Sequence, residues 1–168
     1  MRVLVSTASK HGSTADIGRA IADVLTGEGI EARILAPEQV TSLDDFDAVI
    51  LGSAVYAGRW MKSMKELTER LGEELAARPV WLFSSGPIGD PPKPEEDPVD
   101  VAPIFETTGA RDHFLFSGKL DKKTLNFGER AIVGALKAPE GDFRDWDEIR
   151  DRALSIVEEL TAGVIPRT

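Results

Sequence analysis

The chain has 168 residues, of which 42% are hydrophobic, and this size and composition fit one domain with a conventional core. It contains no cysteine, which excludes thiol nucleophiles, disulfides, iron–sulfur clusters and cysteine-rich zinc sites. The formal net charge of −9, from 20 Lys and Arg against 29 Asp and Glu, argues against nucleic acid as a partner.

Short β-branched runs alternate with longer helical patterns, an order that predicts an α/β fold with a parallel sheet covered by helices on both faces. The first, third and fourth predicted strands are apolar nearly throughout, so we expect them at the centre of the sheet. The more polar second strand is expected at an edge. The five predicted strands are Arg2–Ser6, Ala32–Leu35, Ala48–Gly52, Val80–Ser84 and His113–Phe116.

Three stripes of apolar residues at helical spacing predict helices. The first follows the opening strand and is expected to end near Gly27, and the second runs from Trp60 to Leu75. The third lies near the end of the chain, where Asp145 and Glu148 have the spacing of a capping box. We expect this last helix to dock on the sheet.

Two segments stand outside this alternation. Asp90–Asp100 (DPPKPEEDPVD) combines prolines with acids and predicts a solvated loop. Lys119–Ala138 carries five basic and two acidic residues, a local charge of +3, among apolar side chains. It is interpreted either as an amphipathic helix packed on the domain or as a peripheral contact, through residues 119–138, with anionic lipid.

The location of the protein is also suggested by the sequence. Only three apolar residues follow Arg2 before polar residues appear, so we expect no signal peptide. No apolar run approaches the ~18 residues that a membrane-spanning helix needs. We therefore expect a cytoplasmic protein, with at most a peripheral contact at the inner face of the membrane.

The strongest chemical signal is Ser6–Thr14 (STASKHGST), which lies between the first predicted strand and helix. Hydroxyls, small residues and a glycine at such a turn allow side chains and backbone N–H groups to converge on a phosphate at the positive end of the helix. The alternative is that the hydroxyls only cap the helix. No P-loop motif occurs, and Gly27, Gly29 and Ala32 follow a helix, the reverse of the dinucleotide-binding context. No spacing of His, Asp and Glu indicates a metal site.

The run from Ser9 to Thr14 resembles the phosphate loop of the flavodoxin family, with His11 where a Thr is common. The resemblance implies a flavodoxin-like three-layer sandwich with a five-stranded parallel sheet in the order 2-1-3-4-5. It implies one domain over residues 1–168, with an insertion at about 119–140 between the last strand and the last helix, and FMN as the cofactor. The phosphate is then expected to be held by the hydroxyls of Ser9, Ser13 and Thr14 and by the amides of Lys10, His11 and Gly12.

The same resemblance implies two loops at the flavin ring, each at the carboxyl end of a central strand. Tyr56 is expected to cover one face of the ring, whereas the second loop contains no aromatic residue. The first loop contributes Ser53, Ala54, Val55, Tyr56, Ala57 and Gly58, and the second contributes Ser85, Gly86, Pro87, Ile88 and Gly89.

Within this group the chain is similar to the menaquinone-dependent protoporphyrinogen dehydrogenases. The similarity rests on Ser6-Thr7 before a basic phosphate loop, on the run Gly52–Gly58, and on Phe116-Ser117-Gly118 followed by a basic insertion. It implies an FMN-dependent oxidoreductase that takes electrons from a small-molecule substrate and passes them to a quinone. The alternatives are an electron carrier that docks a larger protein redox partner through its acidic face, and a flavodoxin-like module without FMN that serves only interaction.

Overall fold

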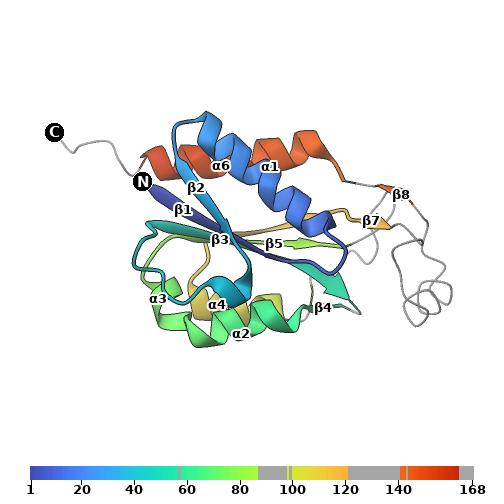
Figure 1. The fold of residues 1–168 in the computed structure, drawn as a ribbon, viewed down its shortest axis with the longest axis horizontal. Helices are drawn as coiled ribbons and strands as arrows, with labels where there is room; N and C mark the ends of the chain where they lie inside the picture. Colours follow the sequence, from blue (N-terminus) through green and yellow to red (C-terminus); the bar gives the residue numbers. More distant parts are fainter. Residues whose placement is uncertain (57, 87–97, 99, 121–140, 143, 163–168) are drawn as a thin grey trace.

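A computed structural model describes residues 1–56, 58–86, 98, 100–120, 141–142 and 144–162. Strands and helices alternate as the sequence predicts, and short extra elements lie between them (Figure 1). In chain order the elements are β1 (Arg2–Ala8), α1 (Ser13–Gly27), β2 (Glu31–Leu35), the 3-10 helix η1 (Pro37–Gln39), β3 (Ala48–Tyr56), β4 (Arg59–Trp60), α2 (Lys62–Arg70), α3 (Gly72–Ala76), β5 (Val80–Ser85), α4 (Val101–Thr108), β6 (Asp112–Phe116), β7 (Lys119–Leu120), β8 (Gly141–Asp142) and α6 (Trp146–Ala162).

The main sheet has the strand order β2-β1-β3-β5-β6, and all of these neighbours are parallel. This is the order 2-1-3-4-5 predicted for the five sequence-derived strands, so the flavodoxin-like α/β architecture is confirmed. The more polar second strand lies at an edge, as expected. β4 adds a short antiparallel partner to the end of β3.

Helices cover both faces of the sheet (Figure 1). α1 and α6 lie on one face, and α2, α3 and α4 lie on the other. Because successive strand residues point to opposite faces, the central strands must be apolar on both sides. Val5 and Ile50 pack under α1 and α6, whereas Leu4 and Leu51 belong to the core on the other side.

Two predicted boundaries were wrong by more than the one- or two-residue shifts seen at an end of β1, β2, β5 and β6. β3 continues from Gly52 to Tyr56 because the residues that were expected to form a loop pair first with β5 and then with β4. The stripe from Trp60 to Leu75 is not one helix. Trp60 belongs to β4, and the helical conformation is interrupted at Leu71, where φ is −116° and a glycine follows.

The C-terminal helix starts as its sequence suggests. The Asp145 carboxylate accepts a hydrogen bond from the Glu148 backbone N–H over 3.0 Å, so one of the two hydrogen bonds of the predicted capping box is present. α6 packs beside α1. β7 and β8 pair antiparallel on either side of residues 121–140, which lie outside the described residues, as does most of the acidic loop. Both interpretations of the basic insertion therefore stay predictions. None of the helices within the described residues is long and apolar enough to cross a membrane.

Candidate functional site

The carboxyl ends of the central strands meet at one edge of the sheet, toward the end of the molecule that holds β4, β7 and β8 in Figure 1. In an open parallel sheet, this edge is where ligands bind, at the point where successive connections leave for opposite faces. Here Ala8 is level with Ser53, and Ala54 is level with Ser85. The residues that follow these positions include those expected to bind a cofactor.

The turn after β1 is held by one glycine and one hydroxyl. Gly12 has φ +86°, a left-handed conformation that favours glycine, and it leads directly into α1. Its N–H donates a hydrogen bond to Ser9 Oγ over 3.0 Å, and its carbonyl accepts one from the Asp16 N–H. Lys10 and His11 are exposed at the tip of this turn. The turn thus brings the six predicted residues, 9 to 14, around the start of α1.

Thr14 gives the clearest indication of a ligand at this turn. It lies in the first turn of α1 and is completely buried, and its hydroxyl has no hydrogen-bond partner among the described residues. Buried polar groups nearly always have a partner, and leaving one without costs about 1–3 kcal/mol. The hydroxyl also lies at a helix N-terminus, where free N–H groups and the helix dipole favour an anion. A phosphate oxygen is the type of acceptor that would satisfy this group.

The hairpin formed by β3 and β4 carries the first of the two expected ring loops. Val55 pairs with Trp60, and Tyr56 pairs with Arg59 across a turn in which Gly58 has φ +74°. Tyr56 is 39% exposed, one of the few large hydrophobic side chains that face solvent among the described residues. Its side chain is therefore exposed at the edge of the sheet where the cofactor is expected.

The start of the hairpin is internally fixed. Ser53 is fully buried, and its hydroxyl donates to the Ala54 carbonyl and accepts from the Met61 N–H, both over 2.9 Å. The Ser53 side chain thus joins the strand that enters the hairpin to the segment that leaves it. Ala54 is buried, and Val55 packs against the core on the α2 side.

The second expected ring loop approaches the hairpin closely where β5 ends. A Cβ on Gly86 would lie 3.1 Å from the Val55 carbonyl oxygen, tighter than ordinary contact. Gly118, after β6, is packed against Gly86 in turn. Ser85 is buried, and its hydroxyl has no partner among the described residues. Ala57, Pro87, Ile88 and Gly89 lie outside the described residues.

The sequence did not identify the polar contacts that hold the β3–β4 hairpin in place. The Trp60 backbone N–H donates to Asp100 Oδ2 over 3.0 Å, and its indole N–H donates to Ser84 Oγ over 2.7 Å. Lys65 also pairs with Asp100 at 3.6 Å. His113 Nε2 lies 2.7 Å from the same Ser84 Oγ.

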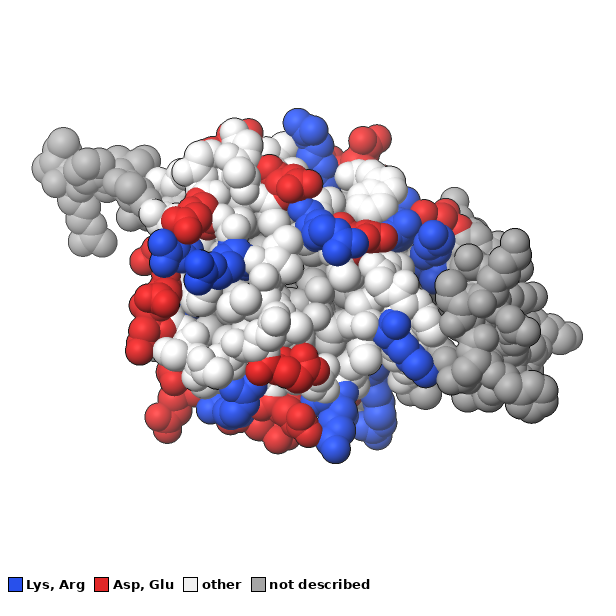
Figure 2. Space-filling view, viewed as in Figure 1, with Lys and Arg blue, Asp and Glu red and all other residues white. Residues whose placement is uncertain are grey.

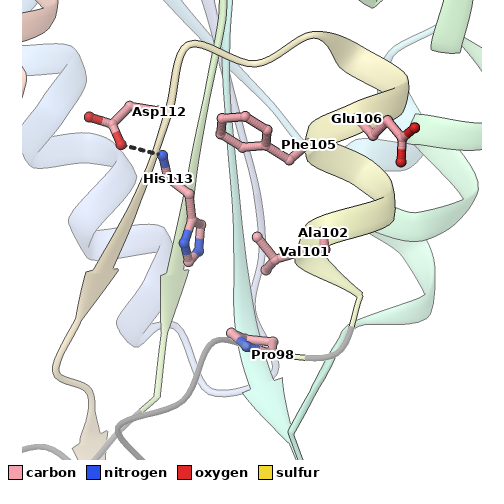
Figure 3. Close-up of a pocket in the computed structure, with 7 residues that line it drawn as sticks. All are labelled: Pro98, Val101, Ala102, Phe105, Glu106, Asp112 and His113. Carbon is pink, nitrogen blue, oxygen red and sulfur yellow. Dashed lines mark hydrogen bonds between the residues drawn. The ribbon is translucent and has the colours of Figure 1, made fainter.

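His113 opens onto a groove between α4 and the edge strand β6 (Figure 3). Its imidazole lies beside Val101 and Phe105 of α4, while its backbone N–H donates to the Asp112 carboxylate over 2.8 Å. The groove is lined by Pro98, Val101, Ala102, Phe105, Glu106, Asp112 and His113.

Arg144 is another residue near the site whose contacts could not be predicted from the local sequence. Its side chain is 6% exposed and forms a two-pronged hydrogen bond with Asp142, over 2.8 and 2.7 Å. The guanidinium also reaches Asp16 at 3.2 Å and the Ser13 carbonyl at 3.4 Å, at the start of α1. It therefore ties the segment after the insertion to the turn that holds Thr14.

This contact changes the ionisation of both carboxyl groups. Hydrogen bonds from Arg144 hold the pKa of Asp142 below its ordinary value. Burial alone would raise the pKa of Asp16, but hydrogen bonds from Arg144 and Arg19 outweigh it and lower that pKa. The hydrogen bonds to Asp142 in turn raise the pKa of Arg144. Since its charge is matched by two carboxylates, we regard Arg144 as a structural clamp and not as a free cation for a ligand.

The face seen in Figure 2 carries charges of both signs around an uncharged central area, and acidic side chains follow one another along its left edge. Within the described residues, no three His, Asp or Glu side chains gather as a metal-binding group.

Comparisons with known proteins agree with this architecture. The sequence matches the family model of a flavodoxin domain over residues 4–147. No curated protein matches the chain significantly. A flavodoxin from the domain Archaea superposes with a TM-score of 0.64 at 16% identity, over 96% of this chain and 99% of that one.

Two further solved structures are similar. Flavodoxin 2 from Bacillus cereus has a TM-score of 0.64 and 18% identity, covering 95% of this chain and 99% of its own. Rubredoxin oxygen:oxidoreductase from Desulfovibrio gigas has a TM-score of 0.66 and 15% identity, and the match covers 98% of this chain but 37% of that larger one. These TM-scores establish a shared fold, and the family match spans most of the sequence. The chain belongs to the flavodoxin domain family.

Proposed function

We propose that this protein binds FMN at the carboxyl edge of its sheet and uses it in electron transfer. The observation that carries the proposal is the buried Thr14 hydroxyl, which has no partner among the described residues and lies at the start of α1. A phosphate monoester supplies acceptors for this hydroxyl and carries the negative charge that the helix N-terminus favours. The residues present therefore fit the phosphate end of FMN.

In this proposal the chain binds and orients the cofactor. The turn from Ser9 to Thr14 holds the phosphate, and Tyr56 covers one face of the ring. The Ser85 hydroxyl, also without a partner among the described residues, supplies a second buried donor near the ring loops. FMN itself supplies the redox chemistry, because it can take up and release electrons singly or in pairs.

We further propose that the protein is an oxidoreductase with a small-molecule partner, similar to the menaquinone-dependent protoporphyrinogen dehydrogenases and passing electrons to a quinone. The supporting observation is an asymmetry between the ring loops. Tyr56 is the aromatic side chain of the first loop, whereas Ser85–Asp90 contains none. One face of the ring would then stay open to a flat substrate such as a quinone.

The second candidate is a carrier that delivers electrons to a larger redox protein. The net charge of −9 favours it, because an acidic protein can be steered toward a basic partner. The structural relatives include proteins named as flavodoxins, and this fold also forms about a third of rubredoxin oxygen:oxidoreductase. The acidic side chains that gather on the face in Figure 2 lie along its left edge, at the end of the molecule away from β4, β7 and β8.

One experiment separates these functions. The FMN-loaded protein is reduced without oxygen and mixed with a menaquinone analogue while flavin absorbance is followed. The oxidoreductase proposal predicts rapid reoxidation with the analogue alone and saturation as its concentration rises. No reaction with the quinone, together with rapid reaction with a redox protein, would favour the carrier. Absence of any bound flavin after loading would overturn both.

A further inference from the structure

The buried Ser84 hydroxyl joins two side chains from distant parts of the sequence. Trp60 Nε1 and His113 Nε2 each lie 2.7 Å from Ser84 Oγ. An indole N–H can only donate, so Ser84 accepts from Trp60 and its own proton is left for another acceptor. All three groups are satisfied when His113 Nε2 carries no proton and accepts the Ser84 hydroxyl. Ser84 is fully buried, and Trp60 is 3% exposed, so water cannot easily replace either bond.

Trp60 is also the anchor of the hairpin that carries Tyr56. Its backbone pairs with Val55, and the neighbouring pair in the same ladder is Tyr56 with Arg59. The backbone N–H of Trp60 is held by Asp100. A shift of the indole would therefore move the short strand and, through the next pair, Tyr56.

We propose that Ser84 is a positioning residue whose hydroxyl, held between Trp60 and His113, fixes the place of Tyr56 against the flavin ring. The inference rests on the proposed function for its flavin component. It adds to that function a chain of contacts from His113 in β6, through Ser84 in β5 and Trp60 in β4, to Tyr56 at the ring. The first three of these residues are not among the expected FMN contacts. Because His113 lines the groove in Figure 3, that chain of contacts ends at the surface between α4 and β6.

The first test needs no flavin. In the protein without FMN, NMR measures how fast the indole N–H of Trp60 exchanges with solvent, with Trp60→Phe used to assign the signal. Ser84→Ala should accelerate this exchange by about two- to tenfold, the factor that corresponds to one net hydrogen bond. Thr68→Val is the matched control. It also removes a buried hydroxyl, but that hydroxyl is bonded to the Lys65 carbonyl within α2.

The second test asks whether Ser84 acts through Tyr56. FMN dissociation constants are measured for the wild type, Ser84→Ala, Tyr56→Ala and the double variant, which form a double-mutant cycle. We expect Ser84→Ala to weaken binding by about two- to tenfold when Tyr56 is present and to have no further effect in Tyr56→Ala. Equal effects of Ser84→Ala in both backgrounds would mean that it loosens the fold in general, and would overturn the inference.

Substitutions at the half-buried His113 provide a test if Ser84→Ala fails to fold. His113→Gln keeps an acceptor near the position of Nε2 and should retain slow Trp60 exchange. His113→Leu removes the acceptor of the Ser84 proton and should accelerate the exchange, but by less than Ser84→Ala, because the Ser84 oxygen that accepts from Trp60 remains. Equal exchange in the two His113 variants would overturn the inference. The wild type could bind FMN while Ser84→Ala changes neither the Trp60 exchange rate nor the FMN dissociation constant in the double-mutant cycle. In that case only this inference is wrong. If the wild type binds no FMN, the proposed function is wrong, and the exchange data alone decide whether Ser84 holds the hairpin.

Discussion

Replacing Thr14 with Val tests the phosphate turn, because it should change stability and ligand affinity in opposite directions. Valine has nearly the same shape as threonine, so it fills the same buried space at the start of α1 without the hydroxyl. In the protein without FMN this hydroxyl has no partner among the described residues. Removing it should therefore raise the free energy of unfolding by about 1 kcal/mol.

The same substitution should weaken FMN binding. A hydrogen bond to a charged group contributes about 1.5–3 kcal/mol, which corresponds to a roughly 10- to 150-fold rise in the dissociation constant. Urea denaturation of the apoprotein measures the first quantity, and titration of FMN fluorescence measures the second. Thr108→Val is the control, because this buried threonine already donates to the Ile104 carbonyl over 2.8 Å. It should gain no stability and lose no affinity.

The outcome that refutes this reasoning is the reverse pattern. If Thr14→Val lowers the stability of the apoprotein and leaves FMN affinity unchanged, then the hydroxyl is a structural cap and the turn does not hold a phosphate. A loss of both would mean that the substitution disturbs the helix start, and Thr14→Ser, which keeps the hydroxyl, should then restore FMN binding if the account is right.

Two other substitutions test the packing and the electrostatics around the site. Gly52→Ala should lower the free energy of unfolding by about 1–3 kcal/mol in urea denaturation, because its Cβ would overlap the buried Phe83 ring; an unchanged midpoint would show that the ring can move aside. Arg144→Met should cost about 1 kcal/mol at pH 7, a modest value because both carboxylate partners are partly exposed. The pKa values of Asp16 and Asp142 are lowered in the folded state, so these carboxylates stabilise the fold fully above about pH 3.9. This stabilisation is lost as the pH falls further, and the free energies of unfolding of the wild type and of Arg144→Met should therefore converge in acid. A difference that stays constant from pH 7 to pH 3 would contradict this assignment.

Much of the fold was predictable because the signals were local. Alternation of buried strands and amphipathic helices fixes the class, and the apolar character of the central strands separates them from the edge strand. The errors occurred where distant contacts override a local pattern. Trp60 fits a helical stripe, but its pairing with Val55 and its bonds to Asp100 and Ser84 place it in a strand.

The candidate site also contains residues that local sequence patterns indicate and residues that only the fold brings together. Ser9 and Gly12 could be identified because a strand, a turn and a helix follow one another directly in sequence. Arg144 could not, because it meets Asp16 across 128 positions and only the fold brings them together. The link from Ser84 to His113 likewise depends on the register of β5 against β6, and no spacing in the sequence encodes it.

The central claim is that the turn from Ser9 to Thr14 grips the phosphate of FMN. Calorimetric titration of the apoprotein with FMN and with riboflavin, which has the same ring and no phosphate, tests it most directly. The account predicts that FMN binds more tightly than riboflavin by at least the roughly 10- to 150-fold of a single charged hydrogen bond. Equal affinities for the two ligands, or no binding of FMN at all, would contradict it.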